Sequence, residues 1–196
     1  MTKQKGVSMF DFIQNVDWFI LNAIHNTFSC GFLDFLMPKI TVLGDVGAIW
    51  LLSGLLLSIS KKYRKYGLAL IIGLVLSFLV SNVFLKPLIA RPRPCWTENV
   101  NLLINNPSDY LFPSGHTLAS VIGAFVITAA NRKFGIFAIP IAVLISFSRL
   151  YLYVHFPSDV LTSVVLGIGI GALAVFTAKK ATNIFDGVKS RKLNRL

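Results

Sequence analysis

The stretch Ser148-Arg149-Leu150-Tyr151-Leu152-Tyr153-Val154-His155-Phe156-Pro157-Ser158-Asp159 joins two strongly apolar segments of the chain. It places an arginine, a histidine and a carboxylate together at the edge of hydrophobic sequence. Ionisable groups at the edge of a membrane span are costly to bury and usually have a function. The stretch therefore predicts a bundle of membrane helices with a functional site at one end.

The composition of the whole chain agrees with a membrane protein. Its 196 residues are 55% hydrophobic and only 14% charged, with a mean hydropathy of +0.70, whereas a soluble domain has about a quarter of its residues charged. The formal net charge is +11. Because the cations flank apolar runs, we attribute them to lipid headgroups and topology rather than to nucleic acid. The length predicts a single all-α membrane domain over residues 1–196.

Five apolar runs without a charged residue are predicted to cross the membrane. They are residues 46–60, 66–85, 117–130, 134–148 and 160–178. The third and fourth are short for spans, but two in tandem around a basic turn fit a transmembrane hairpin better than soluble helices. In the last run, three glycines predict close helix packing: Gly167, Gly169 and Gly171.

The first 45 residues are less regular. Residues 8–29 alternate apolar and polar side chains, which favours an amphipathic helix lying in the membrane interface, although a sixth span remains open. The two cysteines, Cys30 and Cys95, have no zinc-type spacing and are interpreted as apolar filling rather than as a disulfide, with pairing left open.

The distribution of basic residues orders the loops. Two spans separate each basic segment from the next: 61–65, 131–133 and the tail 179–196. They share one side, which the positive-inside rule makes cytoplasmic. Loops 86–116 and 148–159 then face outward, and the N-terminus lies outside with five spans or inside with six. The outer loops nevertheless carry four cations: Lys86, Arg91, Arg93 and Arg149. The positive-inside rule does not require cations on the outer side of the membrane, so their presence there indicates an anion site. Arginine and lysine are suited to binding a phosphate.

The sequence Pro113-Ser114-Gly115-His116 precedes an apolar helix. Ser114 suits the N-cap position, which is its simplest role. A helix N-terminus also presents free N–H groups to phosphate oxygens, and Gly115 permits close approach of a ligand to the backbone. The simplest reading of Lys86 and Arg149 is likewise structural, because such side chains reach headgroups from span ends.

His155 and Asp159 form the second chemical pattern. A residue close before proline prefers extended geometry, so His155 is expected in a loop, with Asp159 in the first turn of the last helix. The carboxylate could accept a hydrogen bond from one ring nitrogen of His155 and leave the other as a nucleophile. Alternatively, Asp159 is only a favourable charge at a helix N-terminus.

Three motifs thus occur in order between residues 86 and 159. Residues 86–94 fit K-x6-R-P, residues 113–116 are P-S-G-H, and residues 148–159 fit S-R-x5-H-x3-D. Together they resemble the signature motifs of the type-2 phosphatidic acid phosphatase superfamily, which are integral-membrane lipid phosphatases. No position departs from the motifs, whereas residues 1–45 carry none.

The resemblance implies a role for each motif residue. His155 attacks phosphorus and forms a phosphohistidine, Asp159 orients His155, and His116 protonates the leaving lipid oxygen and then activates water. The remaining motif residues bind the phosphate oxygens: Lys86, Arg93, Ser114, Gly115 and Arg149. No metal and no cofactor are expected. Arg91 lies outside the motif and is predicted to be a contact at the rim.

The expected function is hydrolysis of a lipid phosphate or diphosphate at the extracytoplasmic face, with the lipid and the bilayer as partners. The motifs leave the substrate open between an undecaprenyl-type isoprenoid diphosphate and a glycerolipid phosphate such as phosphatidylglycerophosphate or phosphatidate. A non-catalytic lipid-binding or scramblase-like protein on the same fold is the alternative. Loss of a motif histidine or aspartate would favour that alternative, and all are present. The oligomeric state is open.

Overall fold

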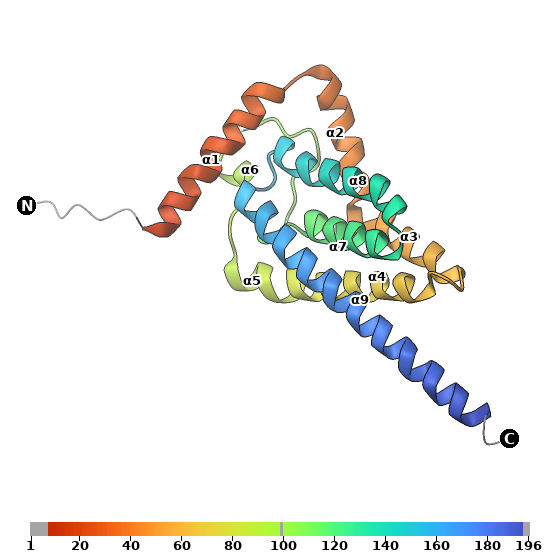
Figure 1. The fold of residues 1–196 in the computed structure, drawn as a ribbon. Helices are drawn as coiled ribbons and strands as arrows, with labels where there is room; N and C mark the ends of the chain where they lie inside the picture. The colour runs from red at the N-terminus through yellow and green to blue at the C-terminus, as the bar shows by residue number, and fades with distance from the viewer. Residues whose placement is uncertain (1–7, 99, 194–196) are drawn as a thin grey trace, which may run out of the picture.

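The structure is a computed structural model that describes residues 8–98 and 100–193, and in these ranges the chain is helical without strands. The long helices are α1 (Met9–Phe28), α2 (Gly31–Leu43), α3 (Ala48–Ile59), α4 (Arg64–Phe78), α7 (Gly115–Ala130), α8 (Arg132–Tyr151) and α9 (Pro157–Leu193). Shorter elements are the 3₁₀ turn η1 (Asp45–Gly47), the π-helical η2 (Leu79–Leu85), α5 (Lys86–Ile89) and α6 (Pro94–Thr97). The predicted all-α membrane bundle is confirmed (Figure 1).

Each of the five predicted spans forms a helix, but the count of five is not confirmed. Within residues 8–98 and 100–193, three segments are long and apolar enough to cross a membrane: Arg64–Thr97, Arg132–Tyr151 and Pro157–Thr182. A fourth span results if α2 and α3 act together across a bend of 45°. Alone, α3 has 12 residues and α7 has 16, fewer than the ~20 that a bilayer requires. The predicted and observed numbers of spans differ because an apolar run without charges does not reveal where its helix bends.

Helix α7 lies at the centre of the bundle, where it packs against α4, α8 and α9. Its small residues allow this close packing. A Cβ atom at Gly123 would lie 2.3 Å from the ring of Trp50, so only glycine fits there without movement. The buried Trp50 in turn donates its Nε1 hydrogen to Ser120 Oγ at 3.0 Å. These contacts fix α7 and therefore the position of its N-terminus.

Helix α9 crosses α7 closely through two of the three predicted glycines. A Cβ at Gly167 would lie 2.7 Å from Val121, and one at Gly171 would lie 3.1 Å from Phe125. Gly169 has no atom within 4 Å of such a Cβ, so the packing prediction is wrong for that residue. The C-terminal half of α9 projects from the bundle (Figure 1).

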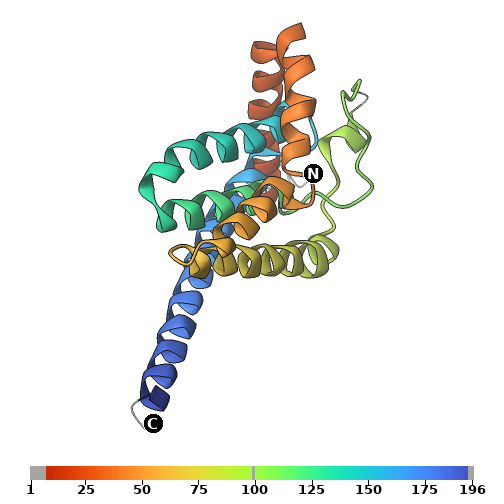
Figure 2. The same cartoon turned by 90° about the vertical axis from the view of Figure 1, so that its right-hand side faces the viewer.

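Helices α1 and α2 meet in a V on the side of the molecule opposite to the end of α9, and both pack against α8 (Figures 1 and 2). A capping box between Ser8 and Asp11 starts α1, as expected for the reciprocal bonds of this motif. Large apolar residues of α1 are exposed: Met9, Phe10, Phe12, Ile13, Val16, Phe19 and Ile20. By contrast, Asp17 and Leu21 are buried. The helix predicted within residues 8–29 is confirmed as α1. Its side toward the bundle carries the carboxyl group of Asp17.

The bend between α2 and α3 depends on left-handed backbone at Val46 (φ 53°) and Gly47 (φ 69°). Glycine adopts this conformation readily, whereas it is uncommon for valine. The bend brings Gly44 against the N-terminus of α7, where a Cβ at Gly44 would lie 2.8 Å from His116 Cδ2. The α2–α3 bend therefore forms one wall of the site described next. Both cysteines, for which pairing was left open, are unpaired, with Cys30 exposed and Cys95 half-buried.

Candidate active site

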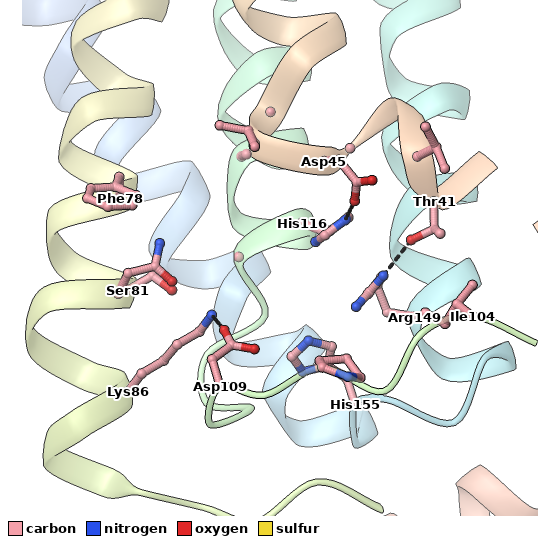
Figure 3. Close-up of a pocket in the computed structure, with 18 of the residues that line it drawn as sticks. Thr41, Asp45, Phe78, Ser81, Lys86, Ile104, Asp109, His116, Arg149 and His155 are labelled. Carbon is pink, nitrogen blue, oxygen red and sulfur yellow. Dashed lines mark hydrogen bonds and ion pairs between the residues drawn. The ribbon is translucent and has the colours of Figure 1, made fainter. Parts of the chain in front are cut away.

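A cavity of about 870 Å³ lies where the α2–α3 bend, α4 and η2, loop 98–113 and the start of α7 meet. Six of the predicted site residues line it: Lys86, Arg93, Gly115, His116, Arg149 and His155. Figure 3 shows Lys86, His116, Arg149 and His155 pointing toward the same space. Ser114 and Asp159 are not among the lining residues, and both side chains are fully buried behind it.

Two of the cations are bound by a carboxylate that the sequence did not single out. Asp109 Oδ2 accepts from Lys86 Nζ, and Asp109 Oδ1 lies 2.7 Å from Arg93 Nη2. Arg93 Nε also donates to the backbone oxygen of Asp109 at 2.8 Å. Burial alone would raise the pKa of the Asp109 carboxyl, but Lys86 and Arg93 outweigh it, so its pKa lies below the ordinary value. The signal in the sequence was an acidic residue inside a loop otherwise rich in cations.

Arg149 is the third cation of the cavity and belongs to the last turn of α8. It is 4% exposed, and its Nη1 donates to Thr41 Oγ1 of α2 at 2.5 Å. Within the described residues its Nε has no hydrogen-bond partner. A buried guanidinium with a free donor is suited to an anionic ligand, since such groups are costly to leave unpaired.

His116 occupies the first turn of α7 and has a partner of its own. Its Nε2 lies 2.8 Å from Asp45 Oδ1, at the α2–α3 bend (Figure 3). Asp45 carries no motif, and the bend that brings it there cannot be read from the sequence. A carboxylate at this distance favours the protonated imidazole, whereas burial and the charge of Arg149 act more strongly against it.

Ser114 and Gly115 precede His116. The Ser114 Oγ accepts from the Thr117 backbone N–H at 3.4 Å, and the Ser114 N–H donates to Ser163 Oγ at 2.8 Å. These are the contacts of a helix cap. Gly115 lines the cavity, and a Cβ there would meet nothing closer than Ser81 Oγ at 3.8 Å. A Cβ atom would therefore fit at this position, so steric crowding does not explain the glycine.

His155 lies in the loop before α9 and is 2% exposed. Its Nε2 is 3.3 Å from Arg93 Nη1. Because a guanidinium only donates, Nε2 is assigned as the acceptor and Nδ1 as the protonated nitrogen. Burial, followed by the charges of Arg93 and Arg149, places the pKa of His155 well below its ordinary value. The lone pair of a neutral imidazole thus faces the cations of the cavity.

Asp159 does not make the contact that was predicted for it. Its Oδ1 accepts from Arg91 Nη1 and its Oδ2 from the Phe156 N–H, both at 2.8 Å. The described residues show no hydrogen bond between Asp159 and His155, and His155 Nδ1 has no partner there. Arg91 was predicted to be a rim contact, and this is wrong, because it is 8% exposed and paired with Asp159.

The described part of the chain contains no group of three His, Cys, Asp or Glu side chains that could hold a metal ion. Positive charge around the cavity instead comes from Lys86, Arg93 and Arg149. Three cations that face a neutral histidine and a histidine–carboxylate pair form an arrangement suited to phosphoryl transfer, which depends mainly on positioning and charge stabilisation.

Comparison with protein families decides the classification. The model of the PAP2 superfamily matches residues 47–183, a range that contains all three motifs. The chain belongs to the PAP2 superfamily. The predicted resemblance is confirmed, and within this PAP2 chain the match runs from the α2–α3 bend into α9.

Several relatives of this PAP2 chain are named as phosphatases of lipids. The undecaprenyl-diphosphatase of Sulfolobus acidocaldarius is 37% identical over 129 residues, which cover 65% of this chain and 62% of that protein. The undecaprenyl-diphosphatase BcrC of Bacillus subtilis is 34% identical over 162 residues, covering 79% and 80%. The crystal structure of a PAP2-type phosphatidylglycerolphosphate phosphatase from Bacillus subtilis matches with a TM-score of 0.71 at 27% identity, covering 87% of this chain and 88% of that one. The prediction of a membrane lipid phosphatase is confirmed at this general level.

Proposed function

We propose that this single-domain PAP2 protein is a metal-independent phosphatase of an isoprenoid diphosphate, of the undecaprenyl type, and that it acts through a phosphohistidine. The observation that carries the proposal is the cavity in which Lys86, Arg93 and Arg149 face His155 and His116. Two relatives at 37% and 34% identity are named undecaprenyl-diphosphatases, which favours this substrate. A glycerolipid phosphate is the second candidate, because the protein matched at a TM-score of 0.71 is named a phosphatidylglycerolphosphate phosphatase.

In the first step the lone pair of His155 Nε2 attacks the terminal phosphorus. A nitrogen–phosphorus bond forms, and the bond from phosphorus to the bridging oxygen breaks. His116 donates a proton to that leaving oxygen, which departs as the lipid monophosphate. Asp45, 2.8 Å from His116 Nε2, stabilises the imidazolium that acts as the acid. Lys86, Arg93 and Arg149 bind the equatorial oxygens, where charge is spread in the transition state.

In the second step the neutral His116 removes a proton from water. The oxygen of the hydroxide formed in this way attacks phosphorus, and the nitrogen–phosphorus bond breaks. Inorganic phosphate then leaves, and His155 is neutral again. Asp109 bonds two of the phosphate-binding cations in the free protein. The substrate phosphate therefore has to displace this carboxylate or share Lys86 and Arg93 with it.

The proposed topology places the cavity at the extracytoplasmic face and the C-terminus in the cytoplasm. The basic segments 61–65, 131–133 and 179–196 support this orientation. In a Cys30→Ser, Cys95→Ser background, Asn105→Cys is expected to react with an impermeant thiol reagent added to intact cells. Reaction only after lysis would reverse the orientation. A tag after Leu196 is expected to be accessible only after lysis.

The function is tested with purified protein, excess chelator and a panel of isoprenoid diphosphates and glycerolipid phosphates. We expect the fastest phosphate release from the isoprenoid diphosphate and no release with His155→Ala. Faster release from phosphatidylglycerophosphate would replace the first substrate by the second. Absence of release from the whole panel, with lipid transfer between leaflets retained, would support the non-catalytic alternative.

A further inference from the structure

Outside the cavity, Arg91 forms a buried ion cluster that the proposed reaction does not use. Its Nη1 donates to Asp159 Oδ1 and Ser158 Oγ, both at 2.8 Å. Its Nη2 donates to Asp17 Oδ2 at 2.6 Å and to Gln14 Oε1 at 2.7 Å. The guanidinium thus joins two carboxylates from opposite ends of the chain. Neither Arg91 nor Asp17 lines the cavity, so neither is placed to touch a substrate phosphate.

On one side the ion cluster contacts the loop that carries His155, the proposed nucleophile. Asp159 is fully buried, and its second oxygen accepts from the N–H of Phe156, the residue directly after His155. The guanidinium carbon of Arg91 lies 4.5 Å from the centre of the Phe156 ring. Arg91 therefore holds both the carboxylate and the ring that flank the His155–Phe156 peptide. A fully buried carboxylate left without its cation is strongly destabilising.

On the other side the cluster reaches helix α1. The carboxylate of Asp17 is 3% exposed and accepts twice from Ser158, from the backbone N–H at 2.8 Å and from Oγ at 2.5 Å. Since Ser158 lies in the first turn of α9, Asp17 satisfies a free N–H group of that helix from outside. Trp18, next in α1, packs edge-on against Phe156 with ring centres 4.8 Å apart. Helix α1, which carries none of the three motifs, thus contacts Phe156 and Ser158, the residues on either side of Pro157 at the start of α9.

We propose that Asp17 and Arg91 are positioning residues for phosphoryl transfer, which act by fixing Asp159 and the His155–Phe156 peptide. This inference rests on the proposed function, since it takes His155 to be the nucleophile. It assigns to α1 a part in catalysis, because removal of the Asp17 charge frees Arg91 and Ser158 without changing the identity of any residue that lines the cavity. Misplacement of a reacting atom by about 1 Å lowers rates by about 100-fold.

The main test is Asp17→Asn, which keeps shape and removes charge, with Arg91→Lys as the second variant. We expect kcat to fall by about 10- to 100-fold with KM within about two-fold of wild type. The loss should be equal for the lipid diphosphate and for p-nitrophenyl phosphate, because attack by His155 is impaired whatever the leaving group. Phosphorylation of His155, trapped at neutral pH after rapid mixing, should slow by the same factor. Asp17→Glu should recover part of kcat.

The matched control is Asn22→Ala, also in α1, which loses the hydrogen bond from Tyr153 Oη but leaves the ion cluster intact. We expect its kcat to stay within about two-fold of wild type. Equal losses of kcat and thermal stability in Asn22→Ala and Asp17→Asn would reduce the role of Asp17 to helix docking and overturn the inference. So would an unchanged kcat in Asp17→Asn while wild-type His155 is phosphorylated. If His155→Ala retains turnover and wild type forms no phosphohistidine, the proposed function fails together with the inference.

Discussion

Oδ1 of Asp109 lies 2.7 Å from Nη2 of Arg93, inside the cavity proposed to bind phosphate. The same carboxylate bonds Lys86, so one internal anion pairs with two of the three cations before any substrate arrives. Its lowered pKa keeps Asp109 ionised throughout the neutral range. Asp109 and a phosphate group therefore compete for the same donors.

Asp109→Asn is expected to tighten the binding of inorganic phosphate. The amide keeps the size of the side chain but gives up its charge, so Lys86 and Arg93 become available to a ligand. We expect the inhibition constant of phosphate or vanadate to fall by about 3- to 10-fold, the scale of one charge-assisted hydrogen bond in a partly exposed site. An inhibition constant that stays the same or rises would show that Asp109 helps to hold the cations for the ligand.

Asp45→Asn is expected to act through His116 alone. Without the carboxylate at 2.8 Å, protonated His116 is less favoured and the leaving oxygen is less well protonated. Turnover of the lipid diphosphate should fall by about 10-fold, within the range that general acids contribute. With p-nitrophenyl phosphate, the burst of p-nitrophenolate release that accompanies phosphorylation of His155 should change little, as it should for His116→Ala, because p-nitrophenolate leaves without protonation. Equal losses for both substrates would remove Asp45 from the acid step.

The pH dependence follows from the lowered pKa of His155. Protonation blocks a histidine nucleophile, and a lowered pKa means that the neutral form persists as pH falls through ~6.5, the ordinary value for histidine. The acid limb of kcat/KM should therefore lie below that pH, and NMR of labelled histidine should show no titration of His155 between about pH 6.5 and 8. Arg93→Gln should move this titration upward, because it removes the nearest positive charge. A His155 resonance that titrates at the ordinary value would contradict the assignment.

Chelators are expected to leave activity intact, because Lys86, Arg93 and Arg149 supply the positive charge around the cavity. Phosphate release should be the same before and after incubation with excess EDTA followed by gel filtration. Loss of release that magnesium restores would require metal ligands not identified in the sequence.

The predicted residues that meet at the cavity share one property: each lies in a loop that is predicted to face outward, or at a span end next to such a loop. The order of spans and basic loops places Lys86, His116 and His155 on one side of the membrane, and the motifs supply their identity. Neither the order of the spans nor the motifs predict a role for Asp45. Its place beside His116 depends on left-handed backbone at Val46, a valine that the sequence does not mark as a turn residue.

Asp17 and Arg91 were overlooked for a different reason. In the sequence, Asp17 is one of several polar residues on a predicted amphipathic helix, and Arg91 is a cation outside the motif, predicted to be a rim contact. Their pairing joins segments 74 residues apart and cannot be seen in local patterns. The available signal was a carboxylate between the apolar residues Val16 and Trp18 in the middle of α1, since buried charges are usually paired.

Helix α7 contains 16 residues and carries His116 in its first turn. Sixteen residues of α-helix measure about 24 Å, less than the ~30 Å of a hydrocarbon core. Any tilt shortens the reach further. With its end near Arg132 at one interface, its N-terminus lies several ångströms below the opposite surface of the membrane. The phosphate of the substrate must then descend to meet His155, or the lipids around the protein must thin. Catalysis should consequently respond to acyl chain length, rising in bilayers of short-chain lipids and falling in thick ones.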